Sequence, residues 1–428
     1  MTDRQMRRKM QNAAAAALRL ATLSTPQKKR VLDRFANLVW AERATLLRAN
    51  KKDLHQAEKS LSPPMFARLK LDEAKIKTLR DGIREVAKAP DPVRRVIDRM
   101  ELDRGLWLEK RTVPIGVIAV IFESRPDVIP QILSLFLKSG NAGLLKGGRE
   151  ARETNRAFMK IIEQLNREFD FLPALWAQLF LERRDVEQIL KHDETVNLVI
   201  PRGSNALVRS IMRKTKIPVL GHADGVCHIY WDKSADFATV RRVVIDAKTQ
   251  YPAVCNAVET LLVHKSRMRE LRGLLCDLEG RGVKIFGDSI VGAPRVRDWH
   301  TEYGDLALSV RVVKSLDEAI DHINKYGSHH TDGILTRDSR AQVRFLAGVD
   351  SATLTVNAST RFADGYRFGM GAEVGISTNK IHARGPVGVE GLVTHQYILV
   401  GKGHIVSDYV ASGKGHVAKR FIHRRVSR

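Results

Sequence analysis

Apolar residues in the first part of the chain recur at the spacing of amphipathic helices. Thr25-Pro26 is a typical helix start, because proline is favoured at the first helical position. The apolar positions that follow are three or four residues apart: Leu32, Phe35, Ala36, Val39 and Trp40. Such intervals place side chains on one face of a helix. We therefore expect several packed helices, extending to about Ala87, with a structural role.

Further along the chain, continuous apolar runs alternate with segments of helical spacing. Three runs are typical of parallel strands buried on both faces: Gly116–Phe122, Ala142–Lys146 and Thr195–Ile200. The helices that follow these runs begin at Pro126, Ala151 and Ser204. This alternation predicts an α/β fold with a parallel sheet and right-handed crossovers. Ligands of such sheets bind beyond the carboxyl ends of the strands.

Two other segments have the pattern of extended chain. They are Leu106–Pro114, before the first buried run, and Val393–Val400, near the end of the sequence. We expect one of them to present an open sheet edge. Because exposed edge strands are usually covered, this pattern predicts a homodimer or a larger oligomer.

Cys255 lies on a bend between a helix and a strand. A helical pattern runs up to Gln250, Pro252 ends it, and an apolar run begins at Thr260. The next amides, on Asn256 and Ala257, begin a new turn, where unpaired amides lower a thiol pKa and can hold an oxyanion. One interpretation is a nucleophilic cysteine for acyl chemistry. The alternative is an inert, buried cysteine.

Composition limits the class of protein. A chain of 428 residues is long enough for two or three domains. It contains no apolar run of about 18 residues, and its basic start lacks the apolar stretch of a signal peptide. The three cysteines form no CxxC pair. We expect a protein of a reducing compartment, the cytoplasm, with no membrane association.

The formal net charge is +24, so nucleic acid must be considered as a partner. The charge is spread along most of the chain, and we find no zinc-finger spacing or RNA-binding aromatic motif. We interpret it as a solvated basic surface that suits an anionic substrate or a phosphorylated cofactor. The basic tail, residues 411–428, has too few apolar residues to offset the entropy of ordering a free segment. We expect it to be dispensable for catalysis.

Neither a dinucleotide fingerprint nor a metal site is predicted. Gly369–Gly375 has three residues where the glycine fingerprint has two, and no buried strand precedes it. A nucleotide site must therefore use lysine, glycine and hydroxyl groups at strand ends and helix starts. His222, Cys227 and His228 lie close in sequence, but no second ligand pair has the usual spacing, so we expect no metal.

Several blocks between about Pro114 and Gly403 together resemble one family. The most specific are Pro218–His228, Lys248–Gln250 with Val254–Ala257, and Val356–Phe362. Further matches are Phe122–Asp127, Gly140–Ala142, Gly371–Thr378 and His382–Pro386. These blocks resemble the γ-glutamyl phosphate reductases, also called glutamate-5-semialdehyde dehydrogenases, of the aldehyde dehydrogenase superfamily.

The resemblance implies an aldehyde dehydrogenase-like α/β fold. A Rossmann-like cofactor-binding domain would span residues 1–230, with residues 361–390 packing back near it. An α/β catalytic domain holding Cys255 would span residues 231–360. Residues 100–114 and 391–410 would form a β-hairpin used for oligomerisation, and residues 411–428 would be the basic tail.

The resemblance also implies an activity. It is the NADPH-dependent reduction of L-glutamyl 5-phosphate to L-glutamate 5-semialdehyde, with release of phosphate, in proline biosynthesis. Cys255 would form a thioester, and glutamate 5-kinase would supply the labile substrate. Oxidising relatives carry a Glu-Leu-Gly-Gly motif whose glutamate activates water. The corresponding place, Leu220–Gly225, has no glutamate, although Asp224 or His222 remains as an alternative base.

The site residues carried over by resemblance form three groups. The catalytic group is Cys255, Asn256 and Arg125, with Arg125 aimed at an oxyanion or phosphate. The cofactor-binding group is Lys146, Gly203, Ser204 and Glu302. The substrate-binding group is Asn357, Ser359, Thr360, Arg361 and Glu373. For these side chains the alternatives are structural hydrogen bonds, surface ion pairs and, for Ser204, helix capping.

The sequence departs from the family pattern at three positions, and at one of them Gly304 replaces a larger residue. Lys146 stands where arginine is more usual, which affects the expected cofactor preference, and Tyr251 follows Gln250 where arginine is common. Alternative functions are an aldehyde dehydrogenase or acylating reductase acting on another acyl group, and a basic nucleic-acid-binding protein on this fold. Steep salt dependence of binding would mark the last.

Overall fold

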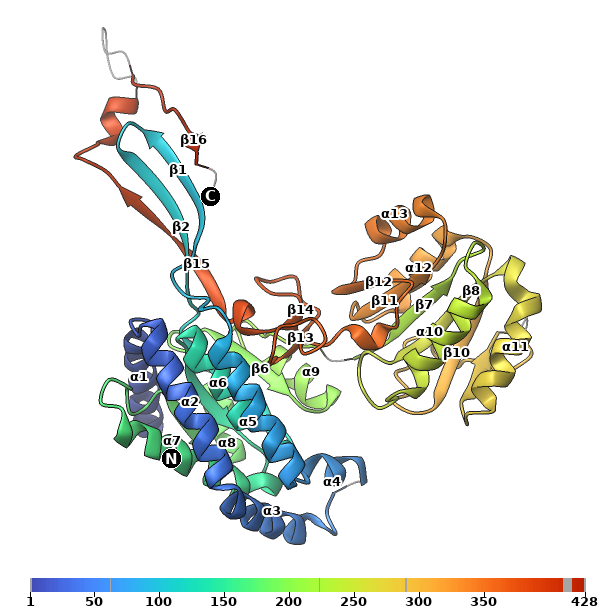
Figure 1. Ribbon diagram of the computed structural model, residues 1–428, viewed down its shortest axis with the longest axis horizontal. Coiled ribbons are helices and arrows are strands. Elements are labelled where there is room, and N and C mark those ends of the chain that lie inside the picture. Colours follow the sequence, from blue (N-terminus) through green and yellow to red (C-terminus); the bar gives the residue numbers. More distant parts are fainter. Residues whose placement is uncertain (1, 62, 223, 289–290, 411–417, 427–428) are drawn as a thin grey trace. The chain divides into compact units, whose positions relative to one another are not determined.

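The protein, in a computed structural model, is described over residues 2–61, 63–222, 224–288, 291–410 and 418–426. The chain divides into two compact units. The first contains residues 1–200, 215–218 and 388–428, and the second contains residues 201–214 and 219–387. Both combine helices with strands (Figure 1), which confirms the predicted α/β class. Among the helices of the described ranges, none is long and apolar enough to cross a membrane.

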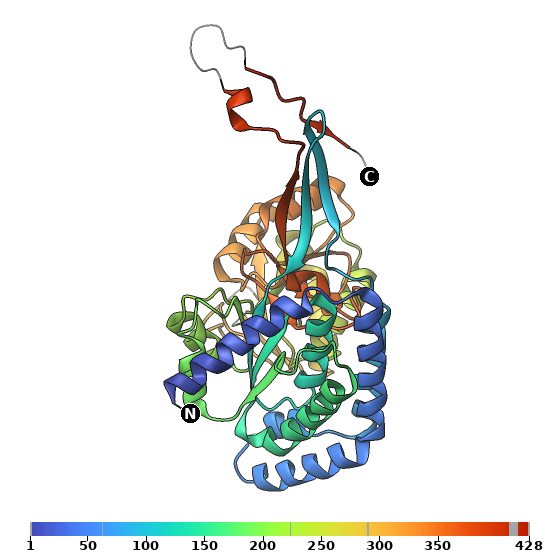
Figure 2. The same ribbon diagram turned by 90° about the vertical axis from the view of Figure 1, so that its left-hand side faces the viewer.

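Helices make up the start of the first unit, as the apolar spacing predicts. They are α1 (Asp3–Leu20), α2 (Thr25–Ala41), α3 (Arg43–Ala57), α4 (Pro63–Leu69) and α5 (Glu73–Lys88). The predicted start of α2 is confirmed, since the Ser24 hydroxyl accepts the Gln27 amide at 3.4 Å in a capping box. Helix α1, the darkest blue helix in Figure 2, packs against the sheet of this unit. Helix α2 packs against α5.

The first unit is built on a four-stranded sheet with the order β5-β4-β3-β6. Its strands are β3 (Val117–Phe122), β4 (Ala142–Lys146), β5 (Ala177–Phe180) and β6 (Leu198–Arg202). The connecting helices are α6 (Val128–Ser139), α7 (Arg152–Glu168) and α8 (Arg183–Ile189). All residues of β3 and β4 are buried, which explains their continuous apolar sequence. The sequence prediction missed only the short β5 and α8 of this set.

The second unit is built on a six-stranded sheet with the order β12-β11-β7-β8-β10-β9, and neighbouring strands are parallel. Its strands are β7 (Cys227–Trp231), β8 (Val258–His264), β9 (Lys284–Gly287), β10 (Ala307–Val313), β11 (Thr331–Leu335) and β12 (Thr353–Val356). Its helices are α9 (Asn205–Lys214), α10 (Phe237–Thr249), α11 (Met268–Glu279), α12 (Leu316–Tyr326) and α13 (Ser339–Gly348).

The division into units differs from the predicted boundary at residue 230. Strand β7 lies before that boundary, yet it hydrogen-bonds between β8 and β11 in the second sheet. Residues 361–387, predicted to pack near the cofactor domain, also belong to the second unit. They contain the small strands β13 (Gly375–Ser377) and β14 (Gly385–Val387). The boundary depends on which strands pair with β7, and those strands are distant in sequence. Local sequence composition contains no signal for such pairing.

A narrow, twisted sheet belongs to the first unit (Figure 1). Its order is β15-β2-β1-β16, formed by β15 (Val393–Val400), β2 (Leu106–Pro114), β1 (Val96–Asp103) and β16 (Arg424–Arg425). The predicted association of the two extended segments is confirmed, with Val393 opposite Pro114 and Val400 opposite Trp107. Strand β15 is the outermost strand on one side. The use of this sheet in oligomerisation stays a prediction.

The C-terminal tail contradicts the expectation of an unordered segment. Ile422 donates its amide to the Leu102 carbonyl at 2.8 Å, and Val426 donates to Arg99 at 3.1 Å. The Phe421 ring stacks on Tyr409, with ring centroids 4.3 Å apart. The entropy argument fails because the segment is not free: the edge of β1 supplies backbone partners. Residues 411–417, 427 and 428 lie outside the described residues.

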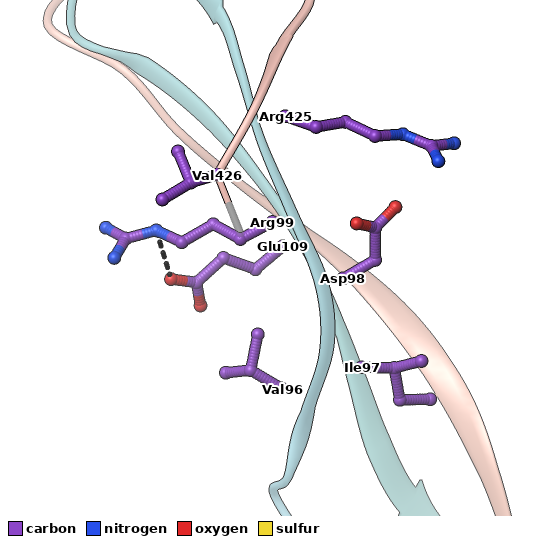
Figure 3. Close-up of a pocket in the computed structure, with 7 residues that line it drawn as sticks. All are labelled: Val96, Ile97, Asp98, Arg99, Glu109, Arg425 and Val426. Atoms are coloured by element: carbon purple, nitrogen blue, oxygen red, sulfur yellow. Dashed lines mark ion pairs between the residues drawn. The ribbon is translucent and has the colours of Figure 1, made fainter. Parts of the chain in front are cut away.

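A hollow lies where the tail crosses β1 (Figure 3). Its lining is Val96, Ile97, Asp98, Arg99, Glu109, Arg425 and Val426. The Arg99 Nε atom lies 3.3 Å from a Glu109 carboxylate oxygen, so this ion pair joins the two strands inside the hollow. None of the predicted site residues lines it, and we assign it a structural role.

Removing residues 413–428 is expected to leave turnover nearly unchanged but to promote self-association. The deletion uncovers the β1 backbone groups that Ile422 and Val426 now pair with, and an open edge strand is a template for another chain. Sedimentation velocity at matched concentrations checks the association, and steady-state turnover checks the activity. A large loss of turnover in a folded, unassociated chain would show that the tail contributes to the active site.

Candidate active site

Cys255 lies in the loop between α10 and β8, half-buried, in the second unit. The loop folds back on itself, because the Ala257 amide donates to the Val254 carbonyl at 2.9 Å. The expectation that the Ala257 amide faces a ligand is therefore wrong. The Asn256 side chain is buried and donates its amide nitrogen to the Ala363 carbonyl at 2.9 Å. Its amide oxygen is buried and has no partner among the described residues.

The backbone of Gly225 packs directly against Cys255. A Cβ atom on Gly225 would lie 2.3 Å from the Cys255 carbonyl oxygen and 2.5 Å from its Cα. The Cys227 thiol donates to the same carbonyl oxygen, at a distance of 3.1 Å. Burial raises the pKa of the Cys227 thiol well above its usual value, so this thiol stays protonated and is no nucleophile. Both contacts fix the position of the Cys255 backbone.

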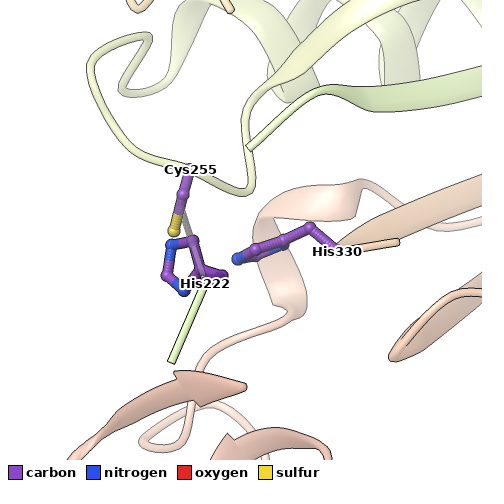
Figure 4. A group of neighbouring side chains, drawn as sticks. All are labelled: His222, Cys255 and His330. Atoms are coloured by element: carbon purple, nitrogen blue, oxygen red, sulfur yellow. The ribbon is translucent and has the colours of Figure 1, made fainter. Parts of the chain in front are cut away.

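Two histidines lie beside the Cys255 thiol (Figure 4). His222 comes from the segment before β7, and His330 directly precedes β11. One ligand atom from each of the three residues lies within 4.8 Å of the others. The two imidazole rings meet edge to face, with centroids 4.7 Å apart. Sequence reasoning missed His330, since only the parallel pairing of β11 with β7 brings it to this place.

The surroundings of His222 define its chemical state. Its Nδ1 atom lies 2.9 Å from the Ile376 carbonyl oxygen, which only accepts hydrogen bonds, so Nδ1 carries the proton. Burial lowers the pKa of His222 more than this hydrogen bond raises it. His222 is therefore a neutral imidazole near neutral pH, and its Nε2 atom carries the lone pair.

A buried ion pair joins the two ends of the cysteine loop. Lys248, in the last turn of α10, donates to a Glu259 carboxylate oxygen and to the Val258 carbonyl oxygen, at 2.8 Å and 2.9 Å. Glu259 lies in β8 and also accepts the Gly304 amide at 3.3 Å. Both side chains are at most 1% exposed. Burial raises the pKa of Glu259 to about 7 and lowers the pKa of Lys248, because it disfavours both charges.

We expect wild-type stability to fall relative to a Glu259→Gln variant as pH rises. The pKa of Glu259 moves from an ordinary 4.5 to about 7 on folding. Its contribution is therefore complete below 4.5 and is lost as pH passes through about 7. The expected relative loss between about pH 5 and pH 8 is roughly 2 kcal/mol. Urea unfolding across this range measures it, and parallel pH profiles of the two proteins would contradict it.

Arg361 lies beside the cysteine loop in a short 3-10 turn, Thr360–Phe362. Its side chain is mostly buried, and its Nε atom donates to the Gln250 side-chain oxygen at 3.1 Å. Burial is the largest cause that lowers the pKa of Arg361. Among the described residues, no carboxylate forms an ion pair with this guanidinium within 4.0 Å. An anion would therefore find here a desolvated, positively charged partner.

Three of the other four predicted substrate residues form side-chain hydrogen bonds within the protein. The Asn357 side chain exchanges two hydrogen bonds with the Thr336 backbone, each 2.9 Å long. The Ser359 hydroxyl caps the 3-10 turn by accepting the Arg361 amide at 3.3 Å. Glu373 accepts the Gly365 amide at 2.8 Å, and its burial raises the pKa of this carboxyl. Thr360 is fully buried, and its hydroxyl has no partner among the described residues.

Three of the predicted cofactor residues lie in the second unit. Gly203 and Ser204 directly precede α9, and the Ser204 hydroxyl accepts the Leu207 amide at 3.4 Å, which is the capping role. Glu302 accepts a hydrogen bond from the Asn205 side chain at 3.2 Å. Asn205 thus links the start of this helix to the loop that carries Glu302. A helix start with free amides is also a site for anions.

Arg125 and Lys146 lie in the first unit, after β3 and at the end of β4. Arg125 is half-buried, and Lys146 is mostly buried with its Nζ atom donating to the Gly147 carbonyl at 2.7 Å. Burial lowers the pKa of Lys146. Strands β3 and β4 are parallel neighbours, so both residues lie at the same edge of this sheet, as predicted. That Arg125 and Lys146 serve the same active site as Cys255 stays a prediction.

The chain is similar to known proteins over most of its length. The profile of the aldehyde dehydrogenase family matches residues 1–278. A γ-glutamyl phosphate reductase of Pelotomaculum thermopropionicum is 52% identical over an alignment of 404 residues, and this alignment covers 91% of this chain and 92% of that protein. The same-named protein of Methanosarcina barkeri is 47% identical and covers 98% of this chain and 97% of its own length.

Solved structures agree with these sequence matches. The crystal structure of γ-glutamyl phosphate reductase from Thermotoga maritima has a TM-score of 0.91 at 36% identity, covering 94% of this chain and 99% of that one. A glyceraldehyde-3-phosphate dehydrogenase from Methanocaldococcus jannaschii, complexed with NADP, has a TM-score of 0.66 at 14% identity, covering 94% of this chain and 95% of that one. At that identity the likeness concerns the fold.

Proposed function

The chain belongs to the γ-glutamyl phosphate reductases of the aldehyde dehydrogenase family, and from this premise we propose that it reduces L-glutamyl 5-phosphate to L-glutamate 5-semialdehyde, releasing phosphate. The observation that carries the proposal is the half-buried Cys255 held in place beside a buried arginine, Arg361, that has no acidic partner among the described residues. The substrate would bring a carboxylate, an ammonium and an acyl phosphate to this place. The product belongs to proline biosynthesis.

The reaction follows from the chemistry of a thiolate. Cys255 attacks the acyl carbon, the bond to phosphate breaks, and the acyl group remains as a thioester. A bound nicotinamide cofactor supplies hydride. After reduction at the acyl carbon, the hemithioacetal collapses, the aldehyde leaves and Cys255 returns as thiolate. Sulfur suits both steps, because it is a strong nucleophile and a good leaving group.

The side chains that would position the substrate have complementary charges. Arg361 would hold the carboxylate, since its guanidinium has only the neutral Gln250 as a side-chain partner in the described contacts. Glu373 would hold the ammonium, which would lower the raised pKa of this carboxyl again. Arg125 would stabilise the oxyanion or the departing phosphate. Asn256 would contribute its backbone amide beside the acyl oxygen.

Water is not the expected acyl acceptor. The segment corresponding to the Glu-Leu-Gly-Gly motif of oxidising relatives contains no glutamate. Its one acid, Asp224, forms an ion pair with Arg209 and accepts a hydrogen bond from Asn205 at 2.7 Å. An aspartate held in this way is a poor base for activating water. In the reverse direction, phosphate would therefore release the acyl group.

The aldehyde dehydrogenase family uses nicotinamide cofactors, and we propose that this chain uses NADPH. Lys146, Gly203, Ser204 and Glu302 would hold it, with the lysine offering a positive charge at a strand end. We further propose a cytoplasmic homodimer or larger oligomer that uses the β15 edge. Glutamate 5-kinase would supply the substrate, because an acyl phosphate is too labile to accumulate.

A spectrophotometric assay of the reverse reaction tests the proposed function. Glutamate semialdehyde should reduce NADP only when inorganic phosphate is present, and NADP should be used better than NAD. Arsenate, which mimics phosphate, should support the reaction. Equal rates without phosphate would contradict the phosphorylating mechanism. Faster turnover of an unrelated aldehyde, or dependence on coenzyme A, would favour another acyl substrate within the same family.

A further inference from the structure

The Cys255 thiol and the imidazoles of His222 and His330 make a set of ligands for a metal ion (Figure 4). Three separate segments supply them: the chain before β7, the loop before β8, and the residue before β11. Their ligand atoms lie within 4.8 Å of one another. The three residues are far apart in sequence, so the spacing rules by which we expect no metal do not apply to this cluster.

Both imidazoles engage their Nδ1 atom in a hydrogen bond, and His330 leaves its other nitrogen unpartnered among the described residues. His222 uses Nδ1 on the Ile376 carbonyl at 2.9 Å. His330 uses Nδ1 on the Thr331 hydroxyl, also at 2.9 Å. His330 is fully buried, and its Nε2 atom has no hydrogen-bond partner among the described residues. The ring of His330 points toward His222 and Cys255 (Figure 4). An unpartnered nitrogen in a buried site is costly unless it meets a ligand.

We propose that a thiophilic divalent cation, Zn²⁺, binds reversibly to Cys255, His222 and His330 and inactivates the enzyme. One thiolate and two imidazoles suit zinc, which prefers four tetrahedral ligands and would keep one position open. Zinc bonds of about 2.0 to 2.3 Å separate tetrahedral ligand atoms by about 3.5 Å. The cluster therefore has to contract by about 1 Å, within the range of side-chain rotations.

Inactivation follows from the identity of the thiol. A sulfur lone pair shared with zinc is no longer available to attack an acyl carbon. The metal displaces the thiol proton and leaves no covalent change, so a chelator reverses the effect. Magnesium prefers oxygen ligands and should neither bind here nor inhibit. The binding step stands on the geometry alone, and only its effect on turnover rests on the proposed function.

The test is a titration of the full chain carrying Cys276→Ser, which removes the exposed thiol as a competing site. Co²⁺ is the optical probe, because thiolate coordination produces near-ultraviolet charge-transfer absorption and tetrahedral geometry produces visible bands. Zn²⁺ affinity follows from competition with Co²⁺. The variants are Cys255→Ala, which removes the sulfur, and His330→Asn, which removes the unpartnered nitrogen. His329→Asn is the matched control, since His329 has φ of 60°, a conformation that asparagine tolerates.

We expect one Co²⁺ per chain, no thiolate band in Cys255→Ala, and at least about tenfold weaker zinc binding in His330→Asn. His329→Asn should bind as the parent does. A folded parent chain without a thiolate band, or an unchanged zinc affinity in both Cys255→Ala and His330→Asn, would overturn the proposal. An active enzyme insensitive to micromolar Zn²⁺ would overturn the inhibition alone. A thiolate band in a protein without phosphate-dependent activity would count against the proposed function, not against this site.

Discussion

Replacing Cys255 with serine should lower turnover by roughly 10³-fold or more while the protein stays folded. The thiolate must attack the acyl phosphate and later leave from the reduced carbon. A serine alkoxide is scarce near neutral pH and leaves poorly, so both steps suffer. The side chain is half-buried, and oxygen is smaller than sulfur, so a hydroxyl fits in place of the thiol without repacking. Phosphate-dependent NADP reduction measures the loss, and circular dichroism checks the fold.

Two other cysteines serve as controls for this experiment. Cys276 is exposed on α11, so Cys276→Ser should behave as wild type. Cys227 donates a hydrogen bond to the Cys255 carbonyl, and a serine at that position keeps a donor. Cys227→Ser should therefore retain most activity. Turnover of Cys255→Ser within about tenfold of wild type would exclude covalent catalysis by this residue.

Gly225→Ala should also cause a large loss, although residue 225 carries no reactive group. The added Cβ would lie 2.3 Å, 2.5 Å and 2.7 Å from the carbonyl oxygen, Cα and Cβ of Cys255. None of these atoms is the end of a flexible side chain, so the backbone of the cysteine loop has to move. A displacement of about 1 Å at a reacting group can cost on the order of 10²-fold in rate. We expect a loss of that order in kcat.

Gly273→Ala is the matched control for this steric prediction. Gly273 lies in α11, and among the described residues its added Cβ would meet only the Phe237 ring, at an ordinary 3.6 Å. Alanine also suits a helix better than glycine does. This control should therefore keep full turnover and equal or greater stability. Wild-type kcat in Gly225→Ala would mean that the contact between Gly225 and Cys255 has no role in placing the nucleophile.

The fold was predictable where local pattern and burial agree. The fully buried strands β3 and β4 appear as unbroken apolar runs. The segments of β2 and β15 have the pattern of extended chain, but their pairing was expected only from the family resemblance. The boundary at residue 230 was not predictable in the same way. Strand β7 joins the second sheet through hydrogen bonds to β8 and β11, and those partners lie later in the chain.

In the candidate site, too, local sequence does not show which distant segments come together. Cys255 was recognisable from its bend and from the blocks around it, but His330 has no local signal that separates it from the neighbouring His329. Its role depends on burial and on the crossing of β11 beside β7. Asn357 and Ser359 were expected as substrate contacts from the resemblance of their block, and that role stays a prediction. Their structural hydrogen bonds depend on the position of Thr336 and on the 3-10 turn.

The buried pair of Lys248 and Glu259 has a consequence for the time course of catalysis. It ties together the two ends of a loop whose middle is also held, at Cys255 by Cys227 and at Asn256 by Ala363. A loop restrained at four points gives up its conformational freedom during folding, not in every catalytic cycle. Its amides should therefore exchange slowly with deuterium before any substrate arrives. The nucleophile would wait in its reactive position, and arrival of the substrate would not have to order it.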